Sequence, residues 1–442
     1  METRTNRMLP EPTIDAAMVF IFLGSMWFPG NYTHLFGNWI QPVYEYTSFF
    51  IQIILMLLSS GQSPLEITLI NLKSKFGGVY FFILVMFLDS MLVTWSPKEQ
   101  LISCIRFTVT ILFALWVSEH FEIQQLMQLI CKAQAALILF ILAAMVLMPE
   151  YAWTTQGGRS LCGIVNTKNT CASELLFGGT IFLIYFRMKK DQKQAISLRS
   201  IAFFALNLIL LFLCNATGAR IEMILMAIYV KFLFDNFEKK YRVPSAYFYF
   251  SINALFLFIV WTILPMFEPI LKALGKSVTL TGRTILWHRI VEVMTRSHTF
   301  TGYGYSMFWR DPHAVVQMHN AFGRYSWYSR MTSGCHNDMF ELWTNIGLFG
   351  IGALAVAMFW SFRRTENMTR NEYLVVSTCM LMQTIGGLTE RTFMLFQYQT
   401  LTLFIMMGIG CSSAARRKAH GSSNPVVHHL SASVVSVKKQ SH

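Results

Sequence analysis

Charge is scarce in this sequence. Only 13% of its 442 residues are charged, whereas 54% are hydrophobic. An ordinary soluble domain has about 25% charged residues, so this shortage excludes a soluble enzyme. Aromatic residues make up 15% and the mean hydropathy is +0.44. This composition is typical of a helical membrane protein, in which apolar side chains face lipid and aromatic rings lie at the interface.

Several patterns that mark common functions are missing. The eight cysteines are scattered and form neither a Cys-x-x-Cys motif nor a Cys/His pair at zinc spacing, so we predict no metal site. No phosphate-binding loop, Asp-x-Asp pair in an outer loop or dinucleotide-binding glycine motif occurs, so we predict no cofactor. The net charge is +13, but no basic stripe with interleaved aromatics lies on a soluble module, which excludes nucleic acid as a partner.

Apolar runs of about the length of a membrane span recur along the chain. They predict an all-α integral membrane protein with about twelve spans: Ile14–Phe28, Tyr46–Ser60, Gly78–Trp95, Leu101–Ser118, Ala133–Met148, Cys171–Phe186, Ser200–Cys214, Ala219–Phe234, Ala246–Phe267, Met339–Phe362, Glu372–Leu388 and Thr392–Cys411. We therefore divide the chain into nine spans (1–267), a long loop (268–338), three further spans (339–411) and a polar tail (412–442) that we expect to be disordered and cytoplasmic.

The distribution of Lys and Arg predicts the orientation. If the N-terminus is cytoplasmic, the loops on that side hold most of the 36 Lys and Arg residues, as the positive-inside rule requires. Both termini are then inside, and the loop of residues 268–338 is outside. Its many Arg residues do not contradict this topology, because long loops are exempt from the rule.

The long outer loop is far longer than a connector needs to be. It is rich in Arg, His, Trp and Tyr, and it contains Arg283, Trp287 and a Gly302-Tyr303-Gly304 turn. Arg suits phosphate oxygens and aromatic faces suit sugar rings, so we interpret the loop as a cap over a site for an anionic, sugar-like substrate. The alternative is an ordinary loop whose Arg residues contact lipid headgroups.

Ionisable residues near the outer ends of the spans are a second signal. Arg106, Lys168 with Asn169, Arg220 with Glu222, and Glu390 with Arg391 are all predicted on the side of the long loop. A charge at membrane depth costs about 2.5–3.5 kcal/mol on insertion scales, so each is a candidate for function. Each could instead be an anchor whose long side chain reaches the interface.

His336 and Asn337 open the helix that follows the loop, with Asp338 and Glu341 in its first turn. The helix dipole disfavours the imidazolium ion there, and a neutral imidazole can act as a general base. The alternative is a histidine that only caps the helix.

These motifs, in this order, resemble the O-antigen ligase/O-antigen polymerase superfamily, and most closely its exopolysaccharide repeat-unit polymerase branch. The motifs are Trp95-Ser96-Pro97 followed by Arg106, Gly163-x-x-Asn166-x-Lys168-Asn169, Thr217-Gly218-Ala219-Arg220, Thr281-Gly282-Arg283-x-x-x-Trp287, Gly302-x-Gly304, and His336-Asn337 followed by Glu341 and Gly347-Leu348-x-Gly350. One departure is that Asn169 continues into Thr170-Cys171-Ala172 rather than Leu-Gly.

The resemblance implies a GT-C-like glycosyltransferase of the bacterial inner membrane that needs no metal and acts at the periplasmic face. The implied donor is an oligosaccharide on undecaprenyl diphosphate, which Arg220 and Arg283 would hold, and His336 would activate the acceptor hydroxyl. The substrate-binding set that we predict also includes Arg106, Lys168, Asn169, Asn337 and Arg391. A chain-length regulator, a flippase and membrane lipid are the other partners that the resemblance implies.

Three other functions stay open at this point. The first is ligation of the glycan to lipid A core, since the acceptor site lies in the variable part of the loop. The second is transport of the same lipid-linked saccharide. The third is a small-anion transporter with a receptor-like cap. A transporter is expected to show internal repeats and broken or charged spans at the midplane. This sequence has its charges at one face and a large outer loop, which favours an enzyme.

Overall fold

The computed structural model describes residues 11–27, 40–60, 75–155, 158–165, 167–240, 242, 245–267, 282–322, 334–390 and 398–420. Its helices are α1 (Glu11–Trp27), α3 (Ile40–Ser60), α5 (Gly77–Val93), α6 (Pro97–His120), α7 (Ile123–Leu147), α8 (Pro149–Ala152), α9 (Lys168–Asp191), α10 (Leu198–Leu213), α11 (Thr217–Ile228), α12 (Phe234–Lys240), α13 (Ser245–Phe258), α15 (Arg283–Ser297), α16 (Pro312–Phe322), α18 (Asp338–Phe362), α19 (Arg370–Gly386) and α20 (Tyr398–His420).

Short irregular turns continue some of these helices. One π turn, Tyr229–Leu233, joins α11 to α12, while the π turn Ile259–Ile263 and the 3-10 turn Leu264–Phe267 extend α13. A further 3-10 turn is Thr365–Asn367. The strands β1 (Trp153–Thr154) and β2 (Ser160–Leu161) form a small antiparallel hairpin.

The prediction of an all-α membrane protein is confirmed. A helix occurs within each of the twelve predicted spans, and five helices of the described part of the chain are long and apolar enough to cross a membrane. Four shorter apolar helices accompany them. At the C-terminal end, α20 continues to His420, beyond the predicted end of the last span at Cys411. The rest of the predicted tail, 421–442, lies outside the described residues.

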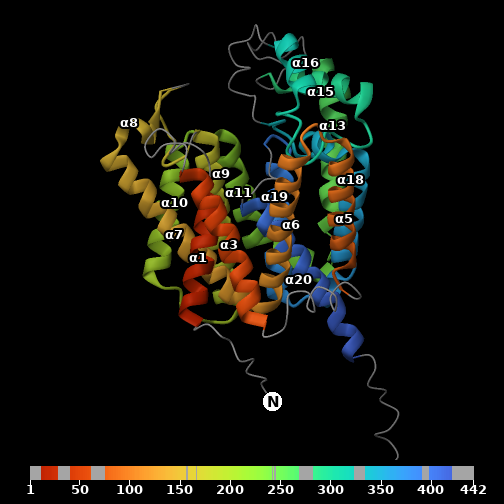
Figure 1. Ribbon diagram of the computed structural model, residues 1–442. Helices are drawn as coiled ribbons and strands as arrows, with labels where there is room; N and C mark the ends of the chain where they lie inside the picture. The colour runs from red at the N-terminus through yellow and green to blue at the C-terminus, as the bar shows by residue number, and fades with distance from the viewer. Residues whose placement is uncertain are drawn as a thin grey trace, which may run out of the picture.

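The spanning helices run side by side along one common direction (Figure 1). Among sequence-distant pairs, α18 packs against α5, α20 against α6, and α19 against α9. Helix α9 also packs against α7, α10 and α11. Large apolar side chains also cover the perimeter, where Leu92 and Leu198 are more than four-fifths exposed. This exposed apolar surface fits a protein whose sides contact lipid.

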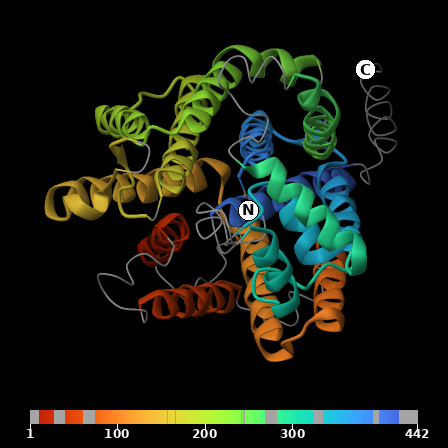
Figure 2. The same ribbon diagram turned by 90° about the horizontal axis from the view of Figure 1, so that it is seen from above.

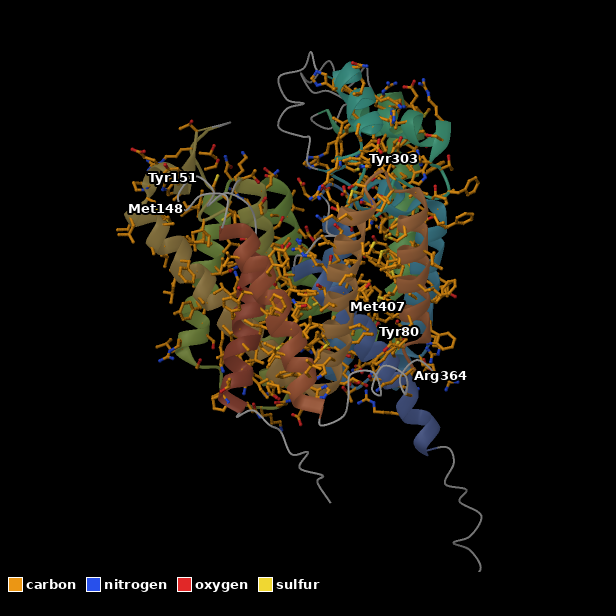
Figure 3. All side chains as sticks on the ribbon, in the orientation of Figure 1. Tyr80, Met148, Tyr151, Tyr303, Arg364 and Met407 are labelled. Atoms are coloured by element: carbon orange, nitrogen blue, oxygen red, sulfur yellow. The ribbon has the colours of Figure 1, made fainter. Side chains whose placement is uncertain are left out.

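The two ends of the bundle differ. Helices α15 and α16 lie at one end and the C-terminal end of α20 lies at the other (Figure 1), and the view from above shows α15 and α16 lying over the bundle (Figure 2). Tyr303 and Arg364 mark these two ends (Figure 3). We call the end with Tyr303 the cap end. Helix α1 begins at the opposite end, where α20 also ends (Figure 1). This agrees with the predicted topology, in which both termini lie on the same side of the membrane.

The cap segment, residues 282–322, has a small core of its own, formed by Leu286, Trp287, Ile290, Met294, Phe308 and Met318 among others. It is attached to the bundle through backbone contacts with α18. Helix α18 is broken at Gly347, where φ is 58° and ψ is −170°. The freed N–H groups of Leu348 and Phe349 donate to the carbonyls of Thr299 (3.1 Å) and Phe300 (3.0 Å). Gly302 and Gly347 allow this close approach, because a Cβ at either position would overlap backbone atoms of the other segment.

A second attachment joins the cap segment to α5 and α6. The N–H of Tyr305 donates to Ser90 Oγ (3.0 Å), and Gln100 Nε2 donates to the carbonyl of Tyr305 (3.2 Å). The Tyr305 ring is buried 4.5 Å from the Phe107 ring, measured between centroids. The cap is therefore fixed to three spans, α5, α6 and α18, at one end of the bundle.

Candidate functional site

Three segments meet at the carboxylate of Glu390, directly after α19 at the cap end. Arg283, the first residue of α15, places Nη2 2.5 Å from Glu390 Oε1. His336, from the segment before α18, places Nδ1 3.0 Å from Glu390 Oε2. Asn169, in the first turn of α9, donates from Nδ2 to Glu390 Oε1 at 3.4 Å. Three of the predicted site residues are thus brought together, although they are far apart in the sequence. We call these four residues the Glu390 cluster.

The loop after α19 is held against the start of α18 by hydrogen bonds. Asn337 is the N-cap of α18: its side chain accepts from the N–H of Phe340 (3.1 Å) and donates to the carbonyl of Leu388 (3.0 Å). The N–H of Asp338 donates to the carbonyl of Gly387 (2.9 Å). A Cβ at Gly387 would lie 2.2 Å from an Asp338 carboxylate oxygen, so a larger residue there would displace that carboxylate. Asn337 therefore supports the site as the cap of α18.

His336 has an unusual backbone. Its φ of +51° lies in the left-handed region, which costs a non-glycine residue about 1–2 kcal/mol. The preceding residue is fixed on both sides, because the N–H of Cys335 donates to Glu341 Oε2 (2.8 Å) and its carbonyl accepts from Trp287 Nε1 (2.8 Å). The surrounding contacts thus hold His336 in a strained conformation that directs its ring toward Glu390. Strain of this kind is found where function needs a fixed side chain.

Glu390 is an ionised carboxylate in this arrangement. Burial opposes its ionisation, but the hydrogen bond with His336 and the positive charge of Arg283 outweigh that effect, so its pKa lies below the ordinary value of 4.5. An ionised carboxylate only accepts hydrogen bonds. The proton in the contact with His336 therefore lies on Nδ1. His336 Nε2 is buried and has no hydrogen-bond partner among the described residues.

A cavity of about 360 Å³ lies beside the cluster, between α9, α11, α19 and the start of α20. Arg283, Glu390 and Asn169 form part of its wall at the cap end. Its other polar lining groups are Ser173, Thr217, Glu222, Gln383, Thr389, Tyr398 and Gln399, and its apolar lining includes Leu176, Phe177, Ile221, Leu225, Phe256 and Met382. A cavity with both kinds of wall suits a ligand that carries polar and apolar parts.

The other predicted site residues lie elsewhere. Thr217, Gly218 and Ala219 line the cavity, but the Arg220 guanidinium donates to the carbonyl of Phe212 and lies 5.4 Å from the centre of its ring. Arg106 on α6 lies 5.7 Å from the centre of the Tyr46 ring. Lys168 is the first residue of α9, next to Asn169, and does not line the cavity. Arg391 lies outside the described residues.

Two residues have a larger part in the site than the sequence predicted. Glu390 is a sequence candidate without an assigned role, yet its carboxylate joins the other three residues of the cluster. Glu222 was noted as a neighbour of Arg220, and it forms a buried part of the cavity wall. The signal available for both was a carboxylate within an otherwise apolar region. Among the described residues, no group of three His, Cys, Asp or Glu side chains is arranged to hold a metal ion.

Comparison with known families relates part of the chain to one of them. Residues 205–355 match the family model described as O-antigen ligase. The matched region runs from α10 through the cap segment to the middle of α18, so it contains Arg220, Arg283 and His336. Neither the curated proteins nor the solved structures contain a match to the chain. This match supports the superfamily predicted from the motifs, whereas its polymerase branch stays a prediction.

Proposed function

We propose that this chain, a member of the O-antigen ligase/polymerase superfamily through residues 205–355, is a glycosyltransferase that polymerises oligosaccharide repeat units carried on undecaprenyl diphosphate. The family match implies a glycosyl-transfer enzyme, and the helices imply a multi-pass membrane protein. The donor, the polymerase branch, the inner-membrane location and the periplasmic site are parts of the proposal. The observation that carries it is the meeting of Arg283 and His336 at one carboxylate beside the cavity.

In the proposed reaction, the acceptor hydroxyl oxygen attacks the anomeric carbon of the donor. The bond from that carbon to the diphosphate oxygen breaks, and the polyprenyl diphosphate leaves with its negative charge. The proton of the acceptor hydroxyl moves to His336 Nε2. A lipid diphosphate is already an activated leaving group, so the enzyme needs to supply positive charge on one side and a base on the other.

Arg283 suits the leaving-group side. One of its nitrogens contacts Glu390, and its Nε has no hydrogen-bond partner among the described residues. The guanidinium therefore keeps donors for phosphate oxygens, which its planar fork binds well. Arg220 is the second diphosphate ligand that the resemblance implies. It lies between the cavity-lining residues Ala219 and Ile221 but does not line the cavity itself, and its guanidinium is directed to Phe212. We therefore assign the main contact to Arg283.

The experiment that tests the function uses the purified full-length protein in liposomes with polyprenyl-diphosphate-linked oligosaccharide. A ladder of products that grow by one repeat unit supports polymerisation. Transfer only when lipid A core is added would support the ligase activity instead. Movement of the donor across the bilayer without any new glycosidic bond would support a transporter and overturn the proposal.

A matching test in cells is deletion of the gene, followed by separate analysis of the polysaccharide and of the lipid A core. Loss of polymer with an unmodified core supports polymerisation. Polymer that is made but does not reach the core supports ligation. Unchanged polymer and core would contradict both activities.

A further inference from the structure

The structure assigns to Glu390 the role of a positioning residue, one that fixes the proton of His336 on Nδ1 and so leaves the Nε2 lone pair free to act as the base. This inference rests on the proposed function, because the base is needed only if an acceptor hydroxyl is deprotonated. It adds a residue that none of the sequence motifs assigned. The hydrogen bond from His336 Nδ1 to Glu390 Oε2 (3.0 Å) carries it.

The two oxygens of Glu390 have different partners. Oε1 accepts from Arg283 (2.5 Å) and Asn169 (3.4 Å), both of which can only donate at the contacting nitrogen. Oε2 faces His336 alone among the contacts of the described residues. Because the carboxylate accepts at both oxygens, His336 must donate to it. A neutral imidazole has one N–H, so its other nitrogen, Nε2, is left as an acceptor.

The backbone around both residues keeps this contact in register. Asn337 and Asp338, which follow His336, are hydrogen-bonded to the carbonyls of Leu388 and Gly387, which precede Glu390 by two and three positions. These hydrogen bonds hold the backbone of His336 close to that of Glu390, so the contact between the two side chains is fixed by the surrounding structure. The strained φ of His336 is compatible with this arrangement, because the neighbouring hydrogen bonds compensate for its cost.

A rival assignment makes Glu390 itself the base. It rests on the position of Glu390 in the cavity wall, whereas His336 is not a lining residue and is hydrogen-bonded to Glu390. The low pKa of Glu390 opposes this role, since a carboxylate held ionised by Arg283 and His336 takes up a proton poorly. The two assignments also predict different behaviour of paired variants, so they can be distinguished by experiment.

The informative variant is Glu390→Gln. Arg283 and Asn169 still require an acceptor at their position, so the amide oxygen faces them and the amide nitrogen faces His336. His336 Nδ1 must then accept, and its proton moves to Nε2, which removes the base. We expect kcat to fall about 100-fold, which is the lower end of the rate enhancement that a positioned general base provides. Since Arg283 keeps its partner, the donor KM should change by no more than about twofold.

Paired variants test whether Glu390 acts through His336. In a His336→Ala background, Glu390→Gln should lower kcat by no more than about a further twofold, because the residue it positions is gone. A loss as large as in the wild-type background would overturn the inference and support Glu390 as the base. Glu292→Gln is the matched control: it removes another carboxylate of the cap that is paired with arginines, Arg289 and Arg296, away from the cluster. Its kinetics should equal those of the wild type.

A second measurement does not depend on activity. Nitrogen-15 NMR of histidine-labelled full-length protein in nanodiscs reports which imidazole nitrogen carries the proton, and the His336→Ala spectrum identifies the His336 signals. We expect an Nδ1–H tautomer in the wild type and in Glu390→Asp, and an Nε2–H tautomer in Glu390→Gln. An Nδ1–H tautomer in folded Glu390→Gln would overturn the inference. Absence of glycan transfer by the wild type would instead overturn the proposed function and leave the tautomer result standing.

Discussion

Arg220 and Arg283 have the same implied role, but the structure gives them different surroundings. Arg283 contacts Glu390 beside the cavity, and Arg220 donates to the carbonyl of Phe212. In Arg283→Lys the positive charge remains but the planar fork is lost, so turnover should fall about 10²–10³-fold, the usual effect of removing one preorganised donor. Arg220→Lys should lose clearly less. Transfer rates of the two purified variants check this, and equal losses would contradict the assignment of the leaving-group contact to Arg283.

His336 provides the second test at this scale. As the base, His336→Ala should lower turnover about 10²–10⁴-fold while the lipid-linked donor still binds. His336→Gln should be as poor, because an amide can form hydrogen bonds but cannot take the proton. If His336 only supported the start of α18, His336→Gln would keep its activity and His336→Ala would lose folded protein. Measurement of turnover per folded molecule separates the two results.

The sequence indicates every residue of the Glu390 cluster as a candidate, but not the central position of Glu390 among them. Arg283, His336 and Asn169 could be predicted because each belongs to a recognisable motif. The contacts of Glu390 could not be predicted, because its partners His336 and Arg283 are 54 and 107 positions away. The direction of a long side chain also cannot be predicted from the sequence. For this reason Arg106 and Arg220 are predicted in the same site as Arg283, although the structure places them away from it.

At the scale of elements, the break in α18 determines how the cap is attached. The Gly347 backbone lies where only glycine is comfortable, and a Cβ there would lie 2.2 Å from the carbonyl oxygen of Phe300. Gly347→Ala should therefore lower the thermal unfolding midpoint and make the cap segment more sensitive to protease, with a cost of about 1–3 kcal/mol or more. Gly352→Ala, in the same helix with open space around it, is the control and should be neutral or slightly stabilising. Equal stability of the two variants would contradict this account of the attachment.

A group of charges at the end opposite the cap joins three other elements. Arg370 at the start of α19 contacts Asp191 (2.9 Å), Asp235 (2.5 Å) and Glu238 (2.7 Å), and Arg187 on α9 also contacts Asp235 (2.6 Å). Hydrogen bonds from Arg187 and Arg370 lower the pKa of Asp235 from 3.8 to about 2. The group therefore clamps α9, α12 and α19 together.

This clamp should depend on pH. Because the folded pKa of Asp235 is depressed, its stabilising effect is fully present above pH 3.8 and is lost as the pH falls toward about 2. Asp235→Asn should lower the unfolding midpoint at pH 7, and most of this difference should be lost near pH 2. The side chain is 41% exposed, so solvent screening limits the loss to at most about 1 kcal/mol. A difference that persists unchanged at pH 2 would contradict the ionic origin of the clamp.

Hydropathy predicted the helices well and their irregularities poorly. The position of each span follows from its apolar composition, which is independent of its partners. The break at Gly347 leaves that composition unchanged, so the sequence predicted a continuous span through it. The clamp was hidden for another reason: Arg187 and Arg370 belong to different predicted loops, and only the packing of α9 against α19 brings them to the same carboxylate.

At the scale of the molecule, the cap and the charge clamp lie at opposite ends of the bundle, as Tyr303 and Arg364 indicate (Figure 3). The Glu390 cluster lies at the cap end, so the side of the membrane that the cap faces is also the side at which the proposed reaction would occur. The proposed donor must be presented on that side. The orientation of the protein in the membrane therefore decides whether the proposed reaction can take place. The basic residues at the end with the clamp predict that this end is cytoplasmic.

Reporter fusions test this topology. A phosphatase that is active only outside the cytoplasm should be active when fused after Phe322, at the end of α16, and inactive after His420, at the end of α20. A fluorescent protein that matures only in the cytoplasm should give the opposite pattern. Fusion after Gln192, in the turn that follows α9, is a control on the cytoplasmic side. The reverse pattern would place Arg283 and His336 in the cytoplasm, where the proposed periplasmic donor is absent, and would overturn the proposed function together with the predicted orientation.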